Sequence, residues 1–352
     1  MTQMRGLLAA RDIGLDLGTH TTRLCLPDDG VVLSEPTAVT VRRGTGEFVR
    51  FGEKALRLLG RSSSSEEMVR PLQKGAIVDY NQTLAMIQYF LRESCGAMLR
   101  QPRMLISAPM GLNDAEKRFL LMAAGEAGAK NVYLTESVRA AALGAGIDIR
   151  LPIGRLVADI GAEVTDVAVL SLSGIVVYET SDHAGKEMDM ALSRYVKNKY
   201  GLLIGELRAE QLKKQIGYVL SPRENLAYEV KGREARTGLP KTQTLLASET
   251  AEPLRAPAGQ ILTQIQRVIR KTPADLLPDL VKSGIVLTGG GSLVKGLPEF
   301  ISRGTGLRCV VADRAEDCVA IGILKTLPYL DDMVEGMLVS DYVHRKPGPR
   351  NY

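Results

Sequence analysis

The chain has 352 residues, of which 45% are hydrophobic and 24% are charged, and its formal net charge is +5. This composition is ordinary for a globular protein, and the length is sufficient for two or more folded units. The positive charge is small and forms no dense basic block, which argues against nucleic acid as a partner but suits an anionic membrane surface.

The cysteine and histidine content argues against a metal centre built from those side chains. The three histidines and four cysteines include no CxxC pair and no cluster with metal-ligand spacing. Thiols placed within apolar runs are typical of a reducing compartment. No apolar run approaches the ~20 residues that a membrane-spanning helix requires.

Strand-like and helix-like segments alternate along the first half of the chain, as in α/β proteins. Asn113 or Asp114, followed by Glu116, forms a helix-capping signature. A polar loop is predicted at 61–68. Strands are predicted at 13–26 (two strands around a turn), 30–43, 102–110 and 131–135. Helices are predicted at 51–61, 83–99, 113–129 and 136–146.

The second half repeats this plan. Residues 283–306 are predicted to form a strand, a glycine loop and a helix. Because each half opens with a strand, an Asp-x-Gly turn and a second strand, the sequence indicates a diverged internal duplication. Three strands are predicted within 155–182, two more around a turn within 225–245, and helices at 186–201, 207–220 and 260–272.

Three glycine turns are expected to converge on one ligand. The first, DLGTHTT at 16–22, would present amides and hydroxyls to an anion, and its carboxylate, Asp16, would face a hydrated Mg²⁺. The second, DIG at 159–161, lies at the matching point of the second half. The third, TGGGS at 288–292, would expose amides at a helix N-terminus. An Asp-x-Gly turn alone also occurs in ordinary hairpins, so the order of the three turns carries the argument.

In this order the turns resemble the nucleotide site of the actin, sugar kinase and heat-shock ATPase superfamily. Within that superfamily the chain looks like a member of the MreB family of bacterial actins, over about residues 12–327. The stretches that carry this resemblance are VVLSEPTAV, RPLQKGAIVDY, GLLIGELRAEQLKKQIG, VKGREARTGLPKT, SGIVLTGGGSLVKGLPEFIS and EDCVAIGIL.

The resemblance implies an actin-like α/β fold of two domains with a nucleotide cleft between them. Each domain would have a ribonuclease-H-like core and a smaller insertion. The expected ranges are 1–33, 75–148 and 326–345 for the first core, 34–74 for its insertion, 149–185 and 257–325 for the second core, 186–256 for its insertion, and 346–352 for a disordered tail.

The resemblance also implies the site residues and the cofactor, ATP or ADP with Mg²⁺. Asp16 and Asp159 would hold the metal. Glu210 and Lys213 lie three apart on a helix and could both reach the adenosine, although a solvated surface pair is the alternative. The expected nucleotide-binding residues are Gly18, Thr19, His20, Thr21, Thr22, Gly161, Ala162, Glu163, Glu210, Lys213, Gly289, Gly290, Gly291 and Ser292.

Two departures from the family pattern affect positions that the resemblance associates with catalysis. Where the family usually has DIGGGTTE, this chain has DIGAEVTD, which introduces Ala162, Glu163 and Val164. Where the family has Glu-Glu-Pro, Glu136 is followed by Ser137, so the carboxylate that helps orient the attacking water is missing. Ser137 and Val164 therefore occupy the usual catalytic positions, and the valine side chain cannot donate or accept a hydrogen bond.

These changes predict weak or absent ATP hydrolysis. Loss of a water-orienting group typically lowers a rate by about 10²–10⁴-fold. A carboxylate at Glu163 would also repel a phosphate by about 4 kcal/mol at 4 Å and an effective dielectric near 20, and so weaken nucleotide binding. A further hypothesis is that Glu163 replaces part of the charge of the terminal phosphate.

Membrane contact is predicted from two short apolar groups. Met4, Leu7 and Leu8 lie at helical spacing beside arginines, as in an interfacial helix, with a frayed leader as the alternative. Met98 and Leu99 precede Arg100 and would insert into the bilayer, unless they close the preceding helix against the core.

The expected function is a cytoskeletal filament that controls cell shape or cell-wall organisation. Its expected location is the cytoplasm, at the inner face of the cell membrane. Its partners would be further copies of itself, an active member of the same family, and the cell-wall elongation machinery. Two alternatives are a fully active ATPase filament, in which Glu136 takes over catalysis, and a small-molecule kinase of the same superfamily.

Overall fold

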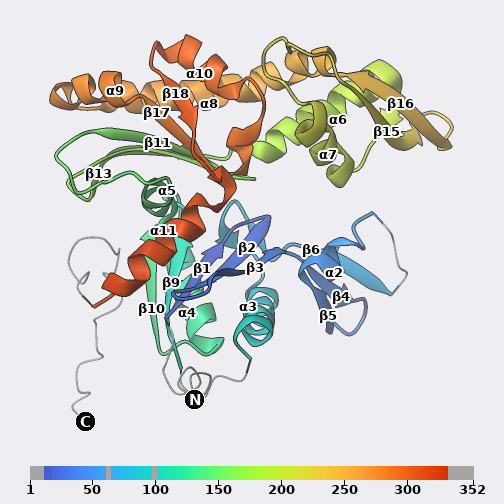
Figure 1. The fold of residues 1–352 in the computed structure, drawn as a ribbon. Helices are drawn as coiled ribbons and strands as arrows, with labels where there is room; N and C mark the ends of the chain where they lie inside the picture. Colours follow the sequence, from blue (N-terminus) through green and yellow to red (C-terminus); the bar gives the residue numbers. More distant parts are fainter. Residues whose placement is uncertain (1–11, 61–64, 97–100, 332–352) are drawn as a thin grey trace. The chain divides into compact units, whose positions relative to one another are not determined.

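The computed structural model describes residues 12–60, 65–96 and 101–331. These residues belong to two compact units (Figure 1). Unit 1 takes Met1–Asp148 and Asp317–Tyr352, and unit 2 takes Ile149–Glu316. The chain is part of unit 1 again from Asp317 onward, whereas the return to the first core was expected at residue 326.

Unit 1 is built on a five-stranded sheet with the order β10-β9-β1-β2-β3. β1 pairs in parallel with β9 and antiparallel with β2, while β9–β10 is parallel and β2–β3 antiparallel. The strands are β1 (Ile13–Leu17), β2 (Thr21–Leu26), β3 (Gly30–Pro36), β9 (Arg103–Ala108) and β10 (Asn131–Glu136).

Helices cover both faces of this sheet (Figure 1). Alternate residues of a strand point to opposite faces. Ile13 and Leu15 of β1 pack into the core with α3 (Tyr80–Cys95) and α4 (Asp114–Glu126). Gly14, between them, faces α11 (Cys318–Thr326), where Ile323 would lie 2.4 Å from an added Cβ. Asn113 caps α4 in a capping box with Glu116, as predicted.

α11 crosses α5 (Ser137–Gly144) at two glycines, which explains why it belongs to unit 1. An ideal Cβ at Gly144 would lie 1.8 Å from the carbonyl oxygen of Cys318. An ideal Cβ at Gly322 would lie 1.8 Å from that of Ala140. Only glycine at these positions allows the two helix backbones to come this close.

Five short strands in the described part of unit 1 form two smaller sheets, β5-β4-β6 and β7-β8. The end of the predicted polar loop, residues 66–68, instead belongs to β6 (Glu66–Val69), which pairs with β4. The prediction was wrong because the polar side chains find partners within the same sheet, as Glu66 of β6 pairs with Arg50 of β5. The elements are β4 (Val39–Arg42), β5 (Phe48–Phe51), α2 (Gly52–Leu56), β6 (Glu66–Val69), β7 (Leu72–Gln73) and β8 (Ala76–Ile77).

Unit 2 repeats the main sheet of unit 1 strand for strand. Its order is β13-β12-β11-β17-β18, with β11 parallel to β17 and antiparallel to β12. β12–β13 is antiparallel and β17–β18 parallel, as in the matching pairs of unit 1. This confirms the predicted duplication. The strands are β11 (Arg155–Ile160), β12 (Thr165–Ser171), β13 (Gly174–Ser181), β17 (Ile285–Thr288) and β18 (Cys309–Val311).

The remaining elements of unit 2 include a three-stranded sheet, β14-β15-β16. α8 begins at Ala251, nine residues before the predicted start at 260, and carries Pro257 within it. The elements are α6 (Gly185–Tyr200), β14 (Leu202–Leu203), α7 (Glu206–Ile216), β15 (Ala227–Glu234), β16 (Pro240–Leu246), η1 (Ala247–Thr250), α8 (Ala251–Lys271), η2 (Ala274–Leu276), α9 (Leu277–Ser283), η3 (Gly290–Leu293) and α10 (Leu297–Thr305). The turn η4 (Ala315–Asp317) leads from unit 2 into α11 of unit 1, and η5 (Leu327–Tyr329) follows α11.

No helix within the described ranges is long and apolar enough to cross a membrane. The predicted membrane residues Met4, Leu7, Leu8, Met98 and Leu99 lie outside the described residues, as does the predicted tail at 346–352.

Candidate functional site

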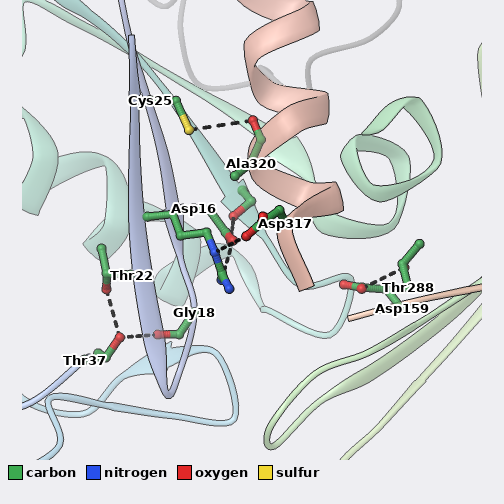
Figure 2. Close-up of polar contacts among 11 residues, drawn as sticks. Asp16, Gly18, Thr22, Cys25, Thr37, Asp159, Thr288, Asp317 and Ala320 are labelled. Atoms are coloured by element: carbon green, nitrogen blue, oxygen red, sulfur yellow. Dashed lines mark hydrogen bonds and ion pairs between the residues drawn. The ribbon is translucent and has the colours of Figure 1, made fainter. Parts of the chain in front are cut away.

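The first glycine turn, between β1 and β2, is held in place by hydrogen bonds from Thr37. Its hydroxyl donates to the carbonyl oxygen of Gly18 at 2.6 Å, and its amide donates to that of His20 at 2.9 Å. Thr22 Oγ1 lies 2.8 Å from Thr37 Oγ1 (Figure 2). The turn therefore has a fixed shape, and the buried Thr22 side chain supports it from the inside.

Thr19 and Gly18 complete this turn. Thr19 Oγ1 accepts a hydrogen bond of 3.0 Å from the amide of Gly75, which ties the turn to the loop after β7. A Cβ at Gly18 would lie 2.6 Å from the carbonyl oxygen of Thr21, so the position requires glycine. The predicted ligands Thr19, His20 and Thr21 thus belong to one preformed turn.

Asp16 lies beside this turn in a network of charged and polar groups. Ser107 Oγ donates to Asp16 Oδ1 at 2.9 Å, and Arg23 Nη1 lies 3.7 Å from Asp16 Oδ2. Arg23 Nε donates to Asp317 Oδ1 at 3.0 Å (Figure 2). Burial raises the pKa of Asp16, while the charge of Arg23 and the hydrogen bond from Ser107 act in the opposite direction. Sequence reasoning did not single out Arg23 or Ser107.

The second glycine turn, between β11 and β12, is held by the start of α6. The amide of Gly161 donates to the carbonyl oxygen of Val164 at 2.9 Å, which closes the turn. The amides of Gly185 and Lys186 donate to the carbonyl oxygens of Gly161 and Ala162 at 3.1 and 2.7 Å. These first-turn amides of α6 therefore bind the protein's own loop.

Glu163 lies within this turn and is paired with a lysine. Its side chain is 7% exposed, and Lys186 Nζ donates to its Oε1 at 2.5 Å. The sequence alone did not reveal Lys186, because no local pattern links two residues 23 positions apart. A carboxylate near the N-terminus of a 16-residue helix is also favoured by the helix dipole.

The third turn packs onto the end of β11. Thr288 Oγ1 donates to Asp159 Oδ1 at 2.8 Å (Figure 2). Gly289 has φ +78°, and a Cβ there would lie 2.3 Å from the carbonyl oxygen of Ile160. Ser292 Oγ donates to the carbonyl oxygen of Gly289 at 2.6 Å. The glycines allow this close approach of two backbones.

The predicted position of these glycines at the start of an α-helix was wrong. Gly290 and Gly291 begin the short 3-10 turn η3, and α10 starts only at Leu297. The reason is local, since the backbone must first turn back over Ile160 at Gly289 and Gly291. Amides of a four-residue turn carry a much smaller dipole than those of a long helix.

Glu210 and Lys213 of α7 have different partners. Lys213 Nζ donates to the carbonyl oxygen of Gly185 at 2.8 Å and lies 2.9 Å from Asp189 of α6. Glu210 Oε1 lies 2.7 Å from Lys214 Nζ on its own helix. Lys213 thus reinforces the first turn of α6, and it remains the better placed of the two to approach a ligand at the second loop.

The position expected to supply a catalytic carboxylate is occupied by Ser137, the first residue of α5. Glu136, immediately before it, lies 3.0 Å from Arg139 Nε through Oε2, and both side chains are largely buried. Val164, at the other expected catalytic position, has no hydroxyl.

The two loops match each other through the duplicated sheets. The register places Arg23 opposite Asp16 on β2, and Asp166 opposite Asp159 on β12. Ser107 and Thr288 then play the same part, each donating a hydroxyl to its aspartate. In the turns between the strands, residues 18–21 correspond to residues 161–164. After the shared glycine, unit 1 has Thr-His-Thr and unit 2 has Ala-Glu-Val.

Comparison with known proteins decides the family. A family model described as MreB/Mbl protein matches residues 10–335. The chain is 36% identical over 325 residues to the cell shape-determining protein Mbl of Bacillus subtilis (strain 168), covering 92% of this chain and 98% of Mbl. It is 36% identical over 337 residues to the cell shape-determining protein MreB of Escherichia coli (strain K12), covering 94% and 97%.

The chain belongs to the MreB/Mbl family.

Solved structures agree with this family and its actin-like fold. MreB5 of Spiroplasma citri bound to AMPPNP has a TM-score of 0.88 at 29% identity, covering 92% of this chain and 98% of that one. The same protein bound to ADP has a TM-score of 0.87. A MamK double helical filament, at a TM-score of 0.75 and 19% identity, supports the fold alone. The predicted fold class, a mixed α/β actin-like fold, is confirmed.

The chain has glycine at Gly18 in the first turn, at Gly161 in the second, and at Gly289, Gly290 and Gly291 in the third. Ser137, Ala162, Glu163 and Val164 are the residues at which the sequence analysis expects this chain to depart from the family pattern. Among the described residues, no group of three or more His, Cys, Asp or Glu side chains forms a complete metal site.

Proposed function

We propose that this protein is a bacterial actin that assembles into filaments for cell-shape control. Its relatives Mbl and MreB are named as cell shape-determining proteins, and they match more than nine-tenths of the chain. The MamK neighbour with the same fold is a double helical filament. The observation that carries this proposal is family membership over nearly the full length, residues 10–335.

The same proposal includes binding of an adenine nucleotide with Mg²⁺. The MreB5 structures bound to AMPPNP and ADP support it, because they align with 92% of this chain. The amides of the turn at residues 18–21 would hold phosphate oxygens. Asp16 and Asp159 would face the hydrated ion, since carboxylate oxygens are ligands that magnesium prefers. Mg²⁺ would neutralise phosphate charge there, and the two hydroxyl donors would keep the carboxylates oriented.

Hydrolysis is the step that this protein performs poorly or not at all. No carboxylate occupies position 137, and position 164 offers no hydroxyl to a water molecule. Glu136, the neighbouring acid, is paired with Arg139 in a largely buried contact. Loss of a water-orienting group usually lowers the rate of hydrolysis by about 10²–10⁴-fold.

Membrane association at the inner face of the cell membrane completes the proposal. It rests on the residues Met4, Leu7, Leu8, Met98 and Leu99 and on the net charge of +5. A co-assembling active member of the family and the cell-wall elongation machinery are the proposed partners. Co-sedimentation with vesicles containing anionic lipid is expected for the intact chain. It should be lost in the Met98→Ser, Leu99→Ser variant if the second group inserts.

The deciding experiment measures filament formation and phosphate release together. Purified protein with Mg-ATP should form sedimentable filaments and release almost no phosphate. The four-fold variant Ala162→Gly, Glu163→Gly, Val164→Thr, Ser137→Glu should release phosphate at least about tenfold faster. Failure to sediment under any nucleotide condition would refute the filament, and wild-type turnover equal to that of the variant would refute the loss of hydrolysis.

An active ATPase that uses Glu136 is the second candidate. It would require Glu136 to leave Arg139, and the side chains of both residues are at most 12% exposed. Separating a buried ion pair is costly, so the structure favours the first candidate. A small-molecule kinase has less support still, because the relatives that match most of the chain are cell shape-determining proteins.

A further inference from the structure

The carbonyl oxygen of Gly18, in the first turn, is held by a chain of two hydroxyl groups. Thr37 Oγ1 donates to it at 2.6 Å, and Thr22 Oγ1 lies 2.8 Å from Thr37 Oγ1 (Figure 2). A threonine hydroxyl has one hydrogen, which Thr37 gives to Gly18, so Thr22 is the donor to Thr37. Both threonine residues are 0% exposed, so solvent cannot replace either hydrogen bond.

Thr37 also holds a second peptide group of the same turn. Its backbone amide donates to the carbonyl oxygen of His20 at 2.9 Å. Because a peptide group is planar and trans, its N–H points to the side opposite its carbonyl oxygen. The amides of Thr19 and Thr21 share their peptide groups with the carbonyls of Gly18 and His20. Both amides therefore point away from Thr37.

The duplicated sheets identify the matching position in unit 2. Two residues after the strand position opposite Thr22 comes Thr37, and two residues after the position opposite Thr165 comes His183. Thr165 Oγ1 donates to the backbone carbonyl oxygen of His183 at 2.7 Å, much as Thr22 donates to Thr37. The imidazole of His183 lies 2.8 Å from Glu187, so this side chain does not take the part of the Thr37 hydroxyl.

The carbonyl that Thr37 holds in unit 1 is held by a helix in unit 2. Gly161 matches Gly18, and its carbonyl oxygen accepts a hydrogen bond of 3.1 Å from the amide of Gly185, at the start of α6. In unit 1 the described chain passes directly from β3 into β4. The side chain of Thr37 therefore supplies in unit 1 the hydrogen bond that a helix amide supplies in unit 2.

We propose that Thr37 is the positioning residue of the first turn, whose hydroxyl and amide direct the N–H groups of Thr19 and Thr21 towards a bound phosphate. This inference rests on the nucleotide binding proposed above. Backbone amides gathered on one side of a turn form a concave site for an anion. A turn that already has this shape loses less conformational freedom when the phosphate binds, and the affinity is higher for that reason.

The test is isothermal titration of the full-length protein with Mg-ADP, below the filament-forming concentration. Thr37→Val keeps the shape of the side chain and removes the hydroxyl, and it should weaken binding of Mg-ADP by about tenfold or more. Thr37→Ser keeps the hydroxyl, and it should bind within about threefold of the wild type. Rescue by serine separates the hydrogen bond from the packing of the side chain, because serine lacks the methyl group.

Thr40 offers a matched control three residues further along the chain. It is likewise 0% exposed, and its hydroxyl has no hydrogen-bond partner among the described residues. Thr40→Val makes the same chemical change as Thr37→Val at a buried threonine of the same segment. It should leave the affinity for Mg-ADP unchanged, because no hydrogen bond to the turn is lost.

Wild-type affinity in a folded Thr37→Val variant would overturn this inference and leave the proposed nucleotide binding intact. Binding as weak in Thr37→Ser as in Thr37→Val would also overturn it, because the hydroxyl would then not be responsible. Absence of Mg-ADP binding to the wild type would overturn the proposed nucleotide binding and this inference together.

Circular dichroism and thermal unfolding of each variant separate loss of binding from loss of fold. If Thr37→Val does not fold, Thr22→Val decides the question, since it removes the hydrogen bond that orients the Thr37 hydroxyl. Binding about threefold weaker than that of the wild type would support the inference, and wild-type affinity would overturn it.

Discussion

Glu136 and Arg139 form an ion pair at the start of α5, with Glu136 Oε2 3.0 Å from Arg139 Nε and side chains 12% and 8% exposed. The pair lies next to Ser137, where a catalytic carboxylate was expected. Its geometry assigns Glu136 a part in stability, because the acid balances the charge of a buried guanidinium.

The first prediction is that Glu136→Gln destabilises the protein without changing phosphate release. The substitution leaves Arg139 without this carboxylate, and breaking a pair of this kind costs about 3 kcal/mol. Urea unfolding measures the stability, and a phosphate-release assay measures the rate. Glu93→Gln, at an exposed position of α3, is the control and should change neither. A large fall in phosphate release with unchanged stability would instead identify Glu136 as catalytic.

The second prediction concerns the glycine crossing of α5 and α11. Gly322→Ala should destabilise unit 1 by about 3 kcal/mol, because the new Cβ would lie 1.8 Å from the carbonyl oxygen of Ala140 and push the helices apart. Gly259→Ala is the matched control in α8, where a Cβ would have no neighbour within 4 Å. It should be neutral or slightly stabilising, since alanine favours helix by up to about 1 kcal/mol. Equal urea midpoints for the two variants would contradict this packing.

Local patterns in the sequence predicted most of the elements, for physical reasons that are visible here. The capping box at Asn113 involves residues only three positions apart. The hairpins β1–β2 and β11–β12 each have a glycine in the turn that joins their two strands. The long helix α8 was predicted too short, because Pro257, which disfavours helix locally, lies within its first turns. The burial of Pro257 among tertiary neighbours stabilises helix where the local pattern does not.

Only part of the candidate site could be predicted from the sequence. The glycines of the three turns could be identified from sequence. The structure explains three of them, since backbone approach is close at Gly18, Gly289 and Gly291, and Gly289 also has a positive φ. The partners of the charged residues could not be identified, since Lys186 reaches Glu163, and Arg23 reaches Asp317, from distant segments. These pairs depend on the completed sheets, and a single sequence contains no signal for them.

The third prediction follows from the pKa of Glu249. Burial alone would raise this pKa, but hydrogen bonds from Lys199, Tyr200 and the amide of Leu246 outweigh burial and lower it to about 2. A lowered pKa stabilises the folded state above the ordinary value of 4.5, and this contribution is lost as pH falls towards about 2. Glu249→Gln should therefore reduce the melting temperature at neutral pH.

The difference in melting temperature between wild type and Glu249→Gln should be constant from about pH 7 to 5 and shrink between about pH 4.5 and 3. Thermal unfolding followed by circular dichroism at a series of pH values measures it. A difference of the same size at about pH 3 as at pH 7 would show that the carboxylate charge contributes nothing. Glu252→Gln, at an exposed position of α8, is the control and should show no such dependence.

The fourth prediction compares two adjacent lysines of α7. Lys213 is 10% exposed and pairs with Asp189, itself 7% exposed, whereas Lys214 is 67% exposed and pairs with Glu210. Lys213→Met should cost about 3 kcal/mol, because it removes a positive partner from a buried carboxylate. Lys214→Met should change stability by less than about 0.5 kcal/mol, as is usual for exposed ion pairs.

A double-mutant cycle completes this comparison. Asp189→Asn combined with Lys213→Met should recover part of the stability lost in Lys213→Met alone, because the buried charge has gone as well. Nucleotide affinity distinguishes a ligand role from a structural one. If Lys213 only supports the first turn of α6, the double variant should regain affinity together with stability. If Lys213 contacts the nucleotide, the double variant should regain stability but stay weak in binding, since the ammonium group is still missing.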